Sequence, residues 1–261
     1  MTERLLRALA PTLVGLLVLG LWEGLVRHYA VPPYKLPGPV AIGCALIEDW
    51  PLLSASLLVT LRIALLALLL AVALGGLLAI LFAQSRWVER AFFPYAVVLQ
   101  VTPIVAIAPL ILIWVDDVTV ALLICAWIVA FFPILSNTVL GLNSADRNLR
   151  ELFQLYGATR WQTLRLLRLP GALPYFLAGL RVAGGLALIG AVVAEFVAGA
   201  GGTGSGLAFR ILEAGYQLKI PRMFAALALI SALGIGIFAA LGLLQHLLLR
   251  RWHESAARAE G

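Results

Sequence analysis

Charged side chains are scarce in this sequence of 261 residues, since only 12% are Asp, Glu, Lys or Arg while 62% are hydrophobic. Soluble domains usually contain about 25% charged residues and roughly half apolar ones. Four long stretches contain no charged residue at all: 63–83, 91–115, 118–140 and 223–249. A hydrocarbon environment accommodates such stretches and water does not, so the composition predicts a membrane protein.

Several catalytic and nucleotide-binding motifs are also missing. There is no G-x-x-x-x-G-K-[ST] phosphate loop, no H-E-x-x-H, no G-x-S-x-G and no C-x-x-C. Gly199–Gly204 matches G-x-G-x-x-G, but it follows an apolar stretch and not the strand that a dinucleotide site requires. The two cysteines, Cys44 and Cys125, are expected in an outer loop and mid-span, so neither a disulfide nor a metal site is indicated. The chain is not expected to be an enzyme.

Six stretches are long and apolar enough to cross a membrane as helices, which takes roughly 20 residues each. The sequence therefore predicts an all-α, polytopic membrane protein with six transmembrane helices, forming a single transmembrane domain over residues 1–261. The expected spans are 8–26, 63–83, 91–115, 118–140, 174–198 and 223–249. Three prolines at 94, 103 and 109 predict a bent third span.

The formal net charge of +6 reflects membrane orientation better than nucleic-acid binding. Basic residues accumulate on the cytoplasmic side of membrane proteins. With the N-terminus inside, the predicted cytoplasmic segments hold twelve of the 19 basic residues and the outer segments five. Both termini and the segment 142–173 are therefore expected to be cytoplasmic. The twelve are Arg4, Arg7, Arg86, Arg90, Arg147, Arg150, Arg160, Arg165, Arg168, Arg250, Arg251 and Arg258.

The segment 142–173 is longer than a connection between two spans needs. Residues 146–156 are expected to form an amphipathic helix, capped by Asn143 or Ser144, and Gly157 permits a left-handed helix end. A second short amphipathic stretch is expected at 161–168. An apolar helix face exposed to cytoplasm must be covered by a partner or by the membrane. The face of the first helix consists of Leu149, Leu152, Phe153 and Tyr156.

At these residues the chain resembles the permease subunits of ATP-binding-cassette (ABC) importers. Their hallmark is E-A-A, three residues, G, nine residues, I, one residue, then L-P. Glu151, Gly157, Leu167, Leu169 and Pro170 match at those spacings, and the chain departs from the pattern by having Leu152 and Phe153 where the family prefers Ala, and Leu167 for Ile.

Further segments are similar to the nitrate, taurine and aliphatic-sulfonate branch, whose members also carry pyrimidine precursors of thiamine. These segments are 36–39, 56–62, 103–114, 132–138 and 193–195. After Trp114 the chain has Val115, Asp116 and Asp117, where that branch usually has an aromatic residue and glycines. The substrate stays open between a small anion and such a heterocycle, and so does the choice between pairing with itself and with a sister permease.

The resemblance implies a type I ABC importer permease in the bacterial inner membrane. It implies a second permease subunit, expected to be another copy of this chain. Two separate cytoplasmic ATPase subunits would hold ATP and Mg²⁺, so no cofactor is expected in this chain, and an extracytoplasmic binding protein would deliver the solute. It also implies that one set of residues couples the permease to the ATPase: Glu151, Leu152, Phe153, Tyr156, Gly157, Ala158, Leu167, Leu169 and Pro170.

The third, fourth and fifth spans are expected to line the translocation pathway. Their polar groups could equally serve hydrogen bonding between helices, and Glu195 could hold the structure together or line the pathway exit. A nucleotide-independent secondary carrier or channel is the alternative class, although carriers usually show more carboxylates within their spans. The pathway candidates are Gln100, Thr102, Pro103, Ser136, Asn137, Thr138 and Glu195.

Overall fold

The computed structural model describes the backbone of residues 2–199 and 204–250, with the side chains of 2–8 and 11 excluded. All regular elements in this described part are helices. They are α1 (Thr2–His28), α2 (Pro39–Glu48), α3 (Trp50–Gln84), α4 (Arg86–Val101), α5 (Ile104–Trp114), α6 (Val118–Asn143), α7 (Arg147–Leu155), α8 (Arg160–Thr163), a π-helical turn (Leu164–Arg168), α9 (Leu169–Ala198), α10 (Leu207–Tyr216) and α11 (Ile220–Leu249).

Within the described residues, four helices are long and apolar enough to span a membrane, or five if the bent pair α4–α5 counts as one span. The four are α3, α6, the continuous run Arg160–Ala198 that contains α9, and α11. The expected first span, 8–26, lies within α1. The polytopic all-helical class is therefore confirmed, while the number of six spans stays a prediction. α3 begins at Trp50, before the expected span 63–83, because Pro51 falls in the first turn, where its missing N–H costs nothing.

The expected single span 91–115 is two helices, α4 and α5, whose axes are bent by 99° at Thr102 and Pro103. Pro103 holds Thr102 in an extended conformation, with ψ at 121°, and the Thr102 hydroxyl donates to the carbonyl of Val98 at 2.7 Å. Pro94 and Pro109 lie inside their helices without ending them. The bend was predicted, but the predicted single helix through Pro103 is wrong, because two separate helices form.

The chain divides into two compact units. One comprises residues 1–58 and 201–231, in which α2, α10 and the first parts of α3 and α11 bury Leu53, Leu207, Ala225 and Ala226. Both α2 and α10 are short helices of ten residues. The other unit comprises residues 59–200 and 232–261 and contains the motif Glu151–Pro170 in the segment after α6.

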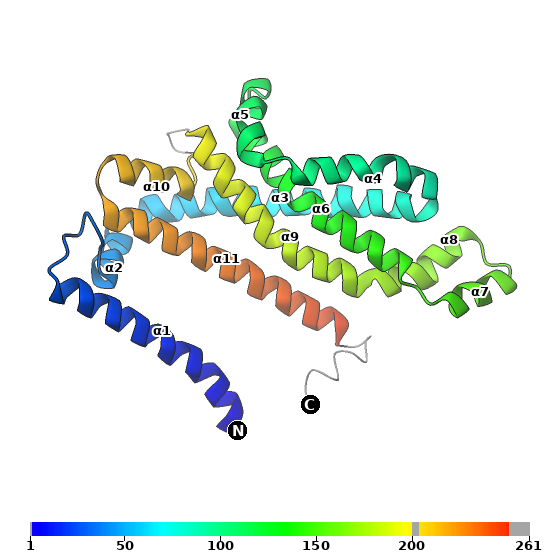
Figure 1. Ribbon diagram of the computed structural model, residues 1–261, viewed down its shortest axis with the longest axis horizontal. Coiled ribbons are helices and arrows are strands. Elements are labelled where there is room, and N and C mark those ends of the chain that lie inside the picture. The colour runs from blue at the N-terminus through cyan, green and yellow to red at the C-terminus, as the bar shows by residue number, and fades with distance from the viewer. Residues whose placement is uncertain (1, 200–203, 251–261) are drawn as a thin grey trace. The chain divides into compact units, whose positions relative to one another are not determined.

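In the second unit α6 and α9 lie side by side and antiparallel (Figure 1). Three glycines bring their backbones together. A Cβ atom on Gly179 would lie 2.7 Å from the carbonyl oxygen of Pro133, one on Gly190 2.9 Å from Cα of Ala126, and one on Gly141 2.9 Å from Cα of Ala172. Small residues permit such close packing of helices in membranes. A Cβ on Gly185, also on α9, would meet nothing within 4 Å.

Candidate functional site

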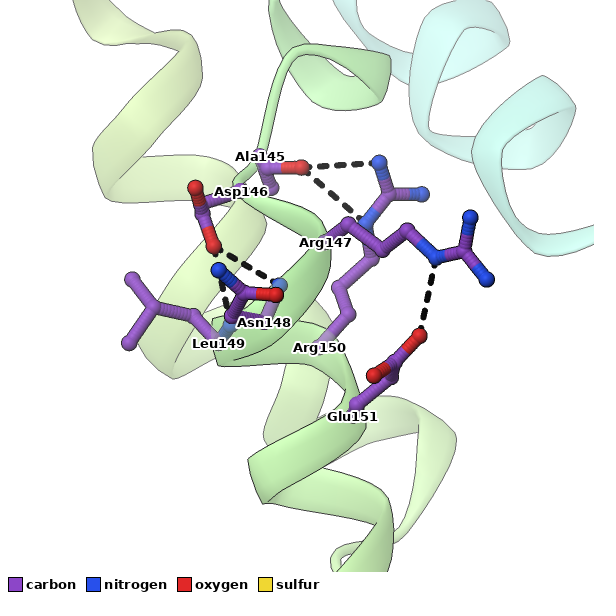
Figure 2. A network of polar contacts seen from close by, with 7 residues as sticks. All are labelled: Ala145, Asp146, Arg147, Asn148, Leu149, Arg150 and Glu151. Carbon is purple, nitrogen blue, oxygen red and sulfur yellow. Dashed lines mark hydrogen bonds and ion pairs between the residues drawn. The ribbon is translucent and has the colours of Figure 1, made fainter.

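The segment between α6 and α9 forms a defined structure at one end of the second unit, where α7 and α8 lie (Figure 1). Asp146 begins α7, and its Oδ1 accepts hydrogen bonds from the backbone N–H groups of Asn148 at 2.7 Å and Leu149 at 3.1 Å (Figure 2). The expected cap at Asn143 or Ser144 is therefore wrong. Asp146 is the better cap because it directly precedes the helix and carries a negative charge toward the helix N-terminus.

Glu151 lies one turn further along α7 and pairs with Arg147. The Arg147 Nε donates to Glu151 Oε1 at 2.8 Å, and both side chains are largely exposed (Figure 2). An exposed pair with this i,i+4 spacing contributes only about 0.3–0.5 kcal/mol. The folded loop therefore depends little on the Glu151 charge, which leaves that carboxylate available for contacts outside this chain.

Gly157 ends α7 in the left-handed conformation, with φ at +69°. The N–H of Gly157 donates to the carbonyl of Gln154 at 3.0 Å, and the N–H of Ala158 donates to that of Phe153 at 2.9 Å. These two bonds form a Schellman motif, which satisfies carbonyls that the helix end would leave unpaired. A Cβ at position 157 would meet nothing within 4 Å, so backbone conformation alone favours glycine there. The expected left-handed stop is confirmed.

No described residue covers the apolar face of α7. Leu149 is 46% exposed, Leu152 44% and Tyr156 83%, while Phe153 is half-buried. Trp161 at the start of α8 is also exposed. Large side chains gathered on one short helix in this way are typical of a surface that binds a partner. Both halves of the expected amphipathic hairpin are present, the second as α8 with the π-helical turn.

Two arginines attach this loop to the helices of the unit. Arg150 Nη2 donates to the carbonyls of Ala145 at 2.7 Å and Asn143 at 3.3 Å, at the C-terminal end of α6 (Figure 2 shows the contact with Ala145). Arg168 Nη1 donates to the carbonyl of Ala83 at 2.6 Å, at the C-terminal end of α3. Helix ends carry unpaired carbonyls and a partial negative charge, which guanidinium groups satisfy. Sequence reasoning treated both residues only as markers of orientation.

The end of the motif leads directly into α9. Leu164 is 1% exposed and packs in a cluster with Phe82, Leu142 and Ala172, against which Leu169 also packs. The π-helical turn at Leu164–Arg168 widens the helix just before Pro170, where the proline ring would otherwise clash with the carbonyl four residues earlier. Leu167, Leu169 and Pro170 are each half-buried. This stretch therefore joins α8 to α9 mechanically.

The pathway candidates fall in three places. Gln100, Thr102 and Pro103 lie at the α4–α5 bend. Ser136, Asn137 and Thr138 lie on α6, where the Asn137 amide donates to the carbonyl of Pro133 at 2.9 Å and the Thr138 hydroxyl to that of Ile134 at 2.6 Å. Glu195 lies on α9. The bonds of Asn137 and Thr138 stay within their own helix, so these two polar groups do not join α6 to another helix through them.

Glu195 is buried, with 3% of its surface exposed, and its Oε1 accepts a hydrogen bond from the hydroxyl of Thr60 at 2.8 Å. Thr60 is itself fully buried, on α3. An ionisable group in a membrane span is costly and requires polar partners. The sequence singled out Glu195 but not Thr60, which is 135 positions away and carries no recognisable signal.

The described part of the chain is an all-helical membrane protein. Its third expected span is broken, and an exposed amphipathic helix is anchored between two long spans. These features are those of the class of transporter permeases. Comparison with known proteins agrees. Residues 71–253 match the model of the binding-protein-dependent transport system inner membrane component family, and the chain belongs to this family.

Two relatives match over almost the whole chain. The formylaminopyrimidine transport permease protein ThiX of Halalkalibacterium halodurans is 37% identical over 95% of this chain and 97% of its own length. The riboflavin transport system permease protein RibX of Chloroflexus aurantiacus is 35% identical over 95% of this chain and 91% of its own length. Permeases named for aliphatic sulfonates, nitrate and taurine also match, which confirms the expected branch.

A solved structure of an amino acid ABC transporter has the same fold, with a TM-score of 0.64 at 20% identity, covering 80% of this chain and 97% of the matched chain. The chain is therefore a multi-pass inner-membrane permease subunit of a binding-protein-dependent ABC importer, and transport by it is not enzymatic catalysis. This assignment decides against the nucleotide-independent carrier or channel.

Proposed function

We propose that α7 is the element through which this permease is coupled to a cytoplasmic ATPase subunit. The single observation that carries the proposal is the uncovered apolar face of Leu149, Leu152 and Tyr156 on a helix that is already folded and capped. A preformed helix loses little conformational entropy when it docks in a groove. Glu151, Phe153, Gly157 and Ala158 would complete the docking surface, with ATP and Mg²⁺ held by the ATPase.

Movement of α7 would reach the membrane spans through the second half of the motif. Leu164 is buried against the ends of α3 and α6, and α8 continues through Leu167, Leu169 and Pro170 into α9. The close glycine contacts make α6 and α9 a tightly packed pair. Closure of the ATPase dimer would therefore shift this pair as a body, and the equilibrium between inward-open and outward-open states with it.

The α4–α5 bend is the part of the unit that we propose to face the solute. Gln100 and Pro103 are exposed there, and the bend exposes backbone groups that a straight helix would pair internally. Irregular backbone at membrane depth is tolerated where it lines a cavity or is covered by protein. Ser136, Asn137, Thr138 and Glu195 would contribute from α6 and α9. The buried bond with Thr60 favours a structural role for Glu195 at the edge of this pathway.

The assembly would consist of two copies of this chain, two ATPase subunits and one extracytoplasmic binding protein, with both chain termini in the cytoplasm. The excess of arginine in the segments assigned to the cytoplasm supports this orientation. Membrane lipid would cover the exposed apolar surfaces of the spans. The single transmembrane domain expected over residues 1–261 stays a prediction.

A small nitrogen heterocycle is the substrate class that we favour over nitrate, sulfonate or taurine. Two relatives that match over 95% of this chain are named for heterocycles, formylaminopyrimidine and riboflavin, at 37% and 35% identity. The matches to permeases named for aliphatic sulfonates, taurine and nitrate cover 85%, 78% and 58% of the chain at 30%, 31% and 28% identity. Selection among heterocycles would rest with the binding protein, because few ionisable groups lie within the spans.

The decisive experiment reconstitutes the chain in liposomes with candidate ATPase and binding-protein subunits from the same organism. A Tyr156→Cys variant would be crosslinked to single cysteines on the ATPase, with Tyr29→Cys, exposed at the end of α1, as the control. We expect crosslinking at position 156 and not at position 29. Uptake of a labelled pyrimidine should require ATP on the side of the membrane where the ATPase lies. Uptake without nucleotide, or equal crosslinking at both positions, would contradict the proposal.

A further inference from the structure

A cavity of about 800 Å³ opens between the junction of α3 with α4 and the loop that carries α7 and α8. Four arginines line it: Arg86 at the start of α4, Arg150 on α7, Arg160 on α8, and Arg168 in the π-helical turn. Glu89 is the one acidic residue among the described residues of the lining. All of these residues belong to the second unit, so the cavity is a feature of that unit alone.

Among the described residues of the lining, positive charge exceeds negative charge by three, from four arginines against one glutamate. Ion pairs between described residues involve Arg27, Arg147, Arg210 and Arg222, and no cavity arginine has a described carboxylate within 4.0 Å. Burial, and then the charges of Arg150 and Arg86, lower the pKa of the Arg168 guanidinium, while Glu89 raises it. Grouping like charges costs free energy, and a bound anion would remove that cost.

The donors in the cavity divide into two kinds. Arg150 and Arg168 bind backbone carbonyls at the ends of α6 and α3, which fixes where their guanidinium groups lie. Arg86 and Arg160 make no hydrogen bond from their side chains to another described residue, so their donors remain available. Guanidinium groups bind phosphate oxygens with two parallel hydrogen bonds. A fixed pair beside an available pair suits an anion with several oxygens.

The position of the cavity suggests the source of that anion. It lies where α3 and α6 end, at the boundary that the proposed orientation assigns to the cytoplasmic membrane surface. Trp87 lies in the lining and is 82% exposed, and tryptophan is enriched at the headgroup level of membranes. Basic pockets between spans on the cytoplasmic side can hold anionic headgroups.

We propose that this cavity binds a phosphate group, supplied by the headgroup of an anionic phospholipid or by soluble phosphate. The ligand would bridge Arg86, at the start of α4, and Arg160, on α8 beyond the coupling helix. Its binding would stabilise the loop against the end of α3 and hold α7 in position for the ATPase. The anion site itself does not require the ATPase, although its effect on coupling rests on the proposed function.

The test measures lipid retention by the purified full chain in detergent, without ATPase, by native mass spectrometry. Phosphatidylglycerol and phosphatidylcholine are titrated separately, and inorganic phosphate is then added as a competitor. We expect phosphatidylglycerol to be retained over phosphatidylcholine, and Arg86→Gln and Arg160→Gln each to weaken retention about tenfold. Arg165→Gln is the matched control, because Arg165 is exposed in the same segment outside the cavity lining.

The two sources give different results. Phosphatidylglycerol retention that millimolar phosphate does not reduce identifies the lipid headgroup, whereas a phosphate-dependent rise in unfolding temperature with no lipid preference identifies the soluble ion. Thermal unfolding and size-exclusion profiles establish that each variant is folded. The proposal is overturned if neither ligand binds, or if the Arg86→Gln, Arg160→Gln and Arg165→Gln variants retain the ligand equally well.

Discussion

Arg168 donates a hydrogen bond of 2.6 Å to the backbone carbonyl of Ala83, a residue 85 positions earlier in the chain. This contact ties the end of the motif after α7 to the end of α3. Arg150 makes the equivalent contact with the end of α6. The loop that carries α7 is therefore attached to two spans by guanidinium groups that bind carbonyls at or just beyond their C-terminal ends.

Removing this attachment should destabilise the loop. Arg168→Gln loses a charged donor to a partly buried carbonyl, which costs about 1.5–3 kcal/mol for hydrogen bonds of this kind. We expect a lower unfolding temperature of the purified protein, measured by tryptophan fluorescence, and reduced ATP-driven uptake. Arg165→Gln removes the same charge at an exposed position. It should change the unfolding temperature and the uptake much less than Arg168→Gln does. Equal stability of the two variants would show that the Ala83 contact contributes nothing.

Gly157 tests whether the shape of the loop matters for coupling. Gly157→Leu places a side chain where φ is +69°, which costs about 1–2 kcal/mol, although no neighbour obstructs it. We expect loss of transport and of stimulated ATP hydrolysis, with normal membrane insertion measured by fractionation. Gly157→Asn is the control, since asparagine tolerates the left-handed region, and it should retain most activity. Full transport by the leucine variant would exclude a role for this conformation.

The packing of α6 against α9 can be tested with two glycines on one helix. A Cβ at Gly179 would lie 2.8 Å from Cβ of Asn137 as well as 2.7 Å from the carbonyl oxygen of Pro133. Gly179→Ala should therefore lower the free energy of unfolding by about 1–3 kcal/mol through overpacking. Gly185→Ala should be neutral, because its Cβ would meet nothing within 4 Å. Unfolding in detergent, followed for both variants in parallel, makes the comparison.

The buried bond between Thr60 and Glu195 should contribute to stability. Thr60→Val keeps the volume but removes the hydroxyl that donates to Glu195 at 2.8 Å, and losing one hydrogen bond to a charged group costs about 1.5–3 kcal/mol. Thr60→Ser, which retains the hydroxyl, should lose much less. A double-mutant cycle with Glu195→Gln measures the interaction itself. Additive effects of Thr60→Val and Glu195→Gln would indicate that the two side chains do not interact in the membrane.

Charge reversal at Glu151 should reduce transport without changing the stability of the protein. The exposed pair with Arg147 contributes only about 0.3–0.5 kcal/mol, so Glu151→Lys should leave the unfolding temperature almost unchanged. Uptake should nevertheless fall sharply, because the reversed charge would face the ATPase groove. Asn148→Lys, which adds a positive charge on the same exposed helix, controls for a general charge effect. Normal uptake by Glu151→Lys would indicate that this carboxylate does not contact the ATPase.

Local features of the loop were well predicted because they depend on neighbours in the sequence. Gly157 ends α7 in the left-handed region, and Leu149, Leu152 and Tyr156 share an exposed face. The cap was misplaced because several residues before the helix can serve, and backbone geometry selects Asp146. The break at Pro103 was harder to predict, since Pro94 and Pro109 have the same chemistry and leave their helices intact.

Contacts between distant segments had no signal in the pattern of residues. Arg168 was read as one of many cytoplasmic cations, and Thr60 as part of the start of a span. Only packing brings Arg168 to Ala83 and Thr60 to Glu195. The same holds for Gly141, which meets Ala172 because α6 and α9 run antiparallel at close range.

By itself, then, the sequence determined the helical membrane class, the amphipathic segment after α6 and the family, because hydrophobicity, helix periodicity and motif spacing are properties of residues close along the chain. Tertiary structure alone decided that the third span breaks at Pro103, that two arginines hold the loop to helix ends, and that four arginines converge on one cavity. Each of these depends on which helix ends meet in space, and that follows from the packing of whole helices.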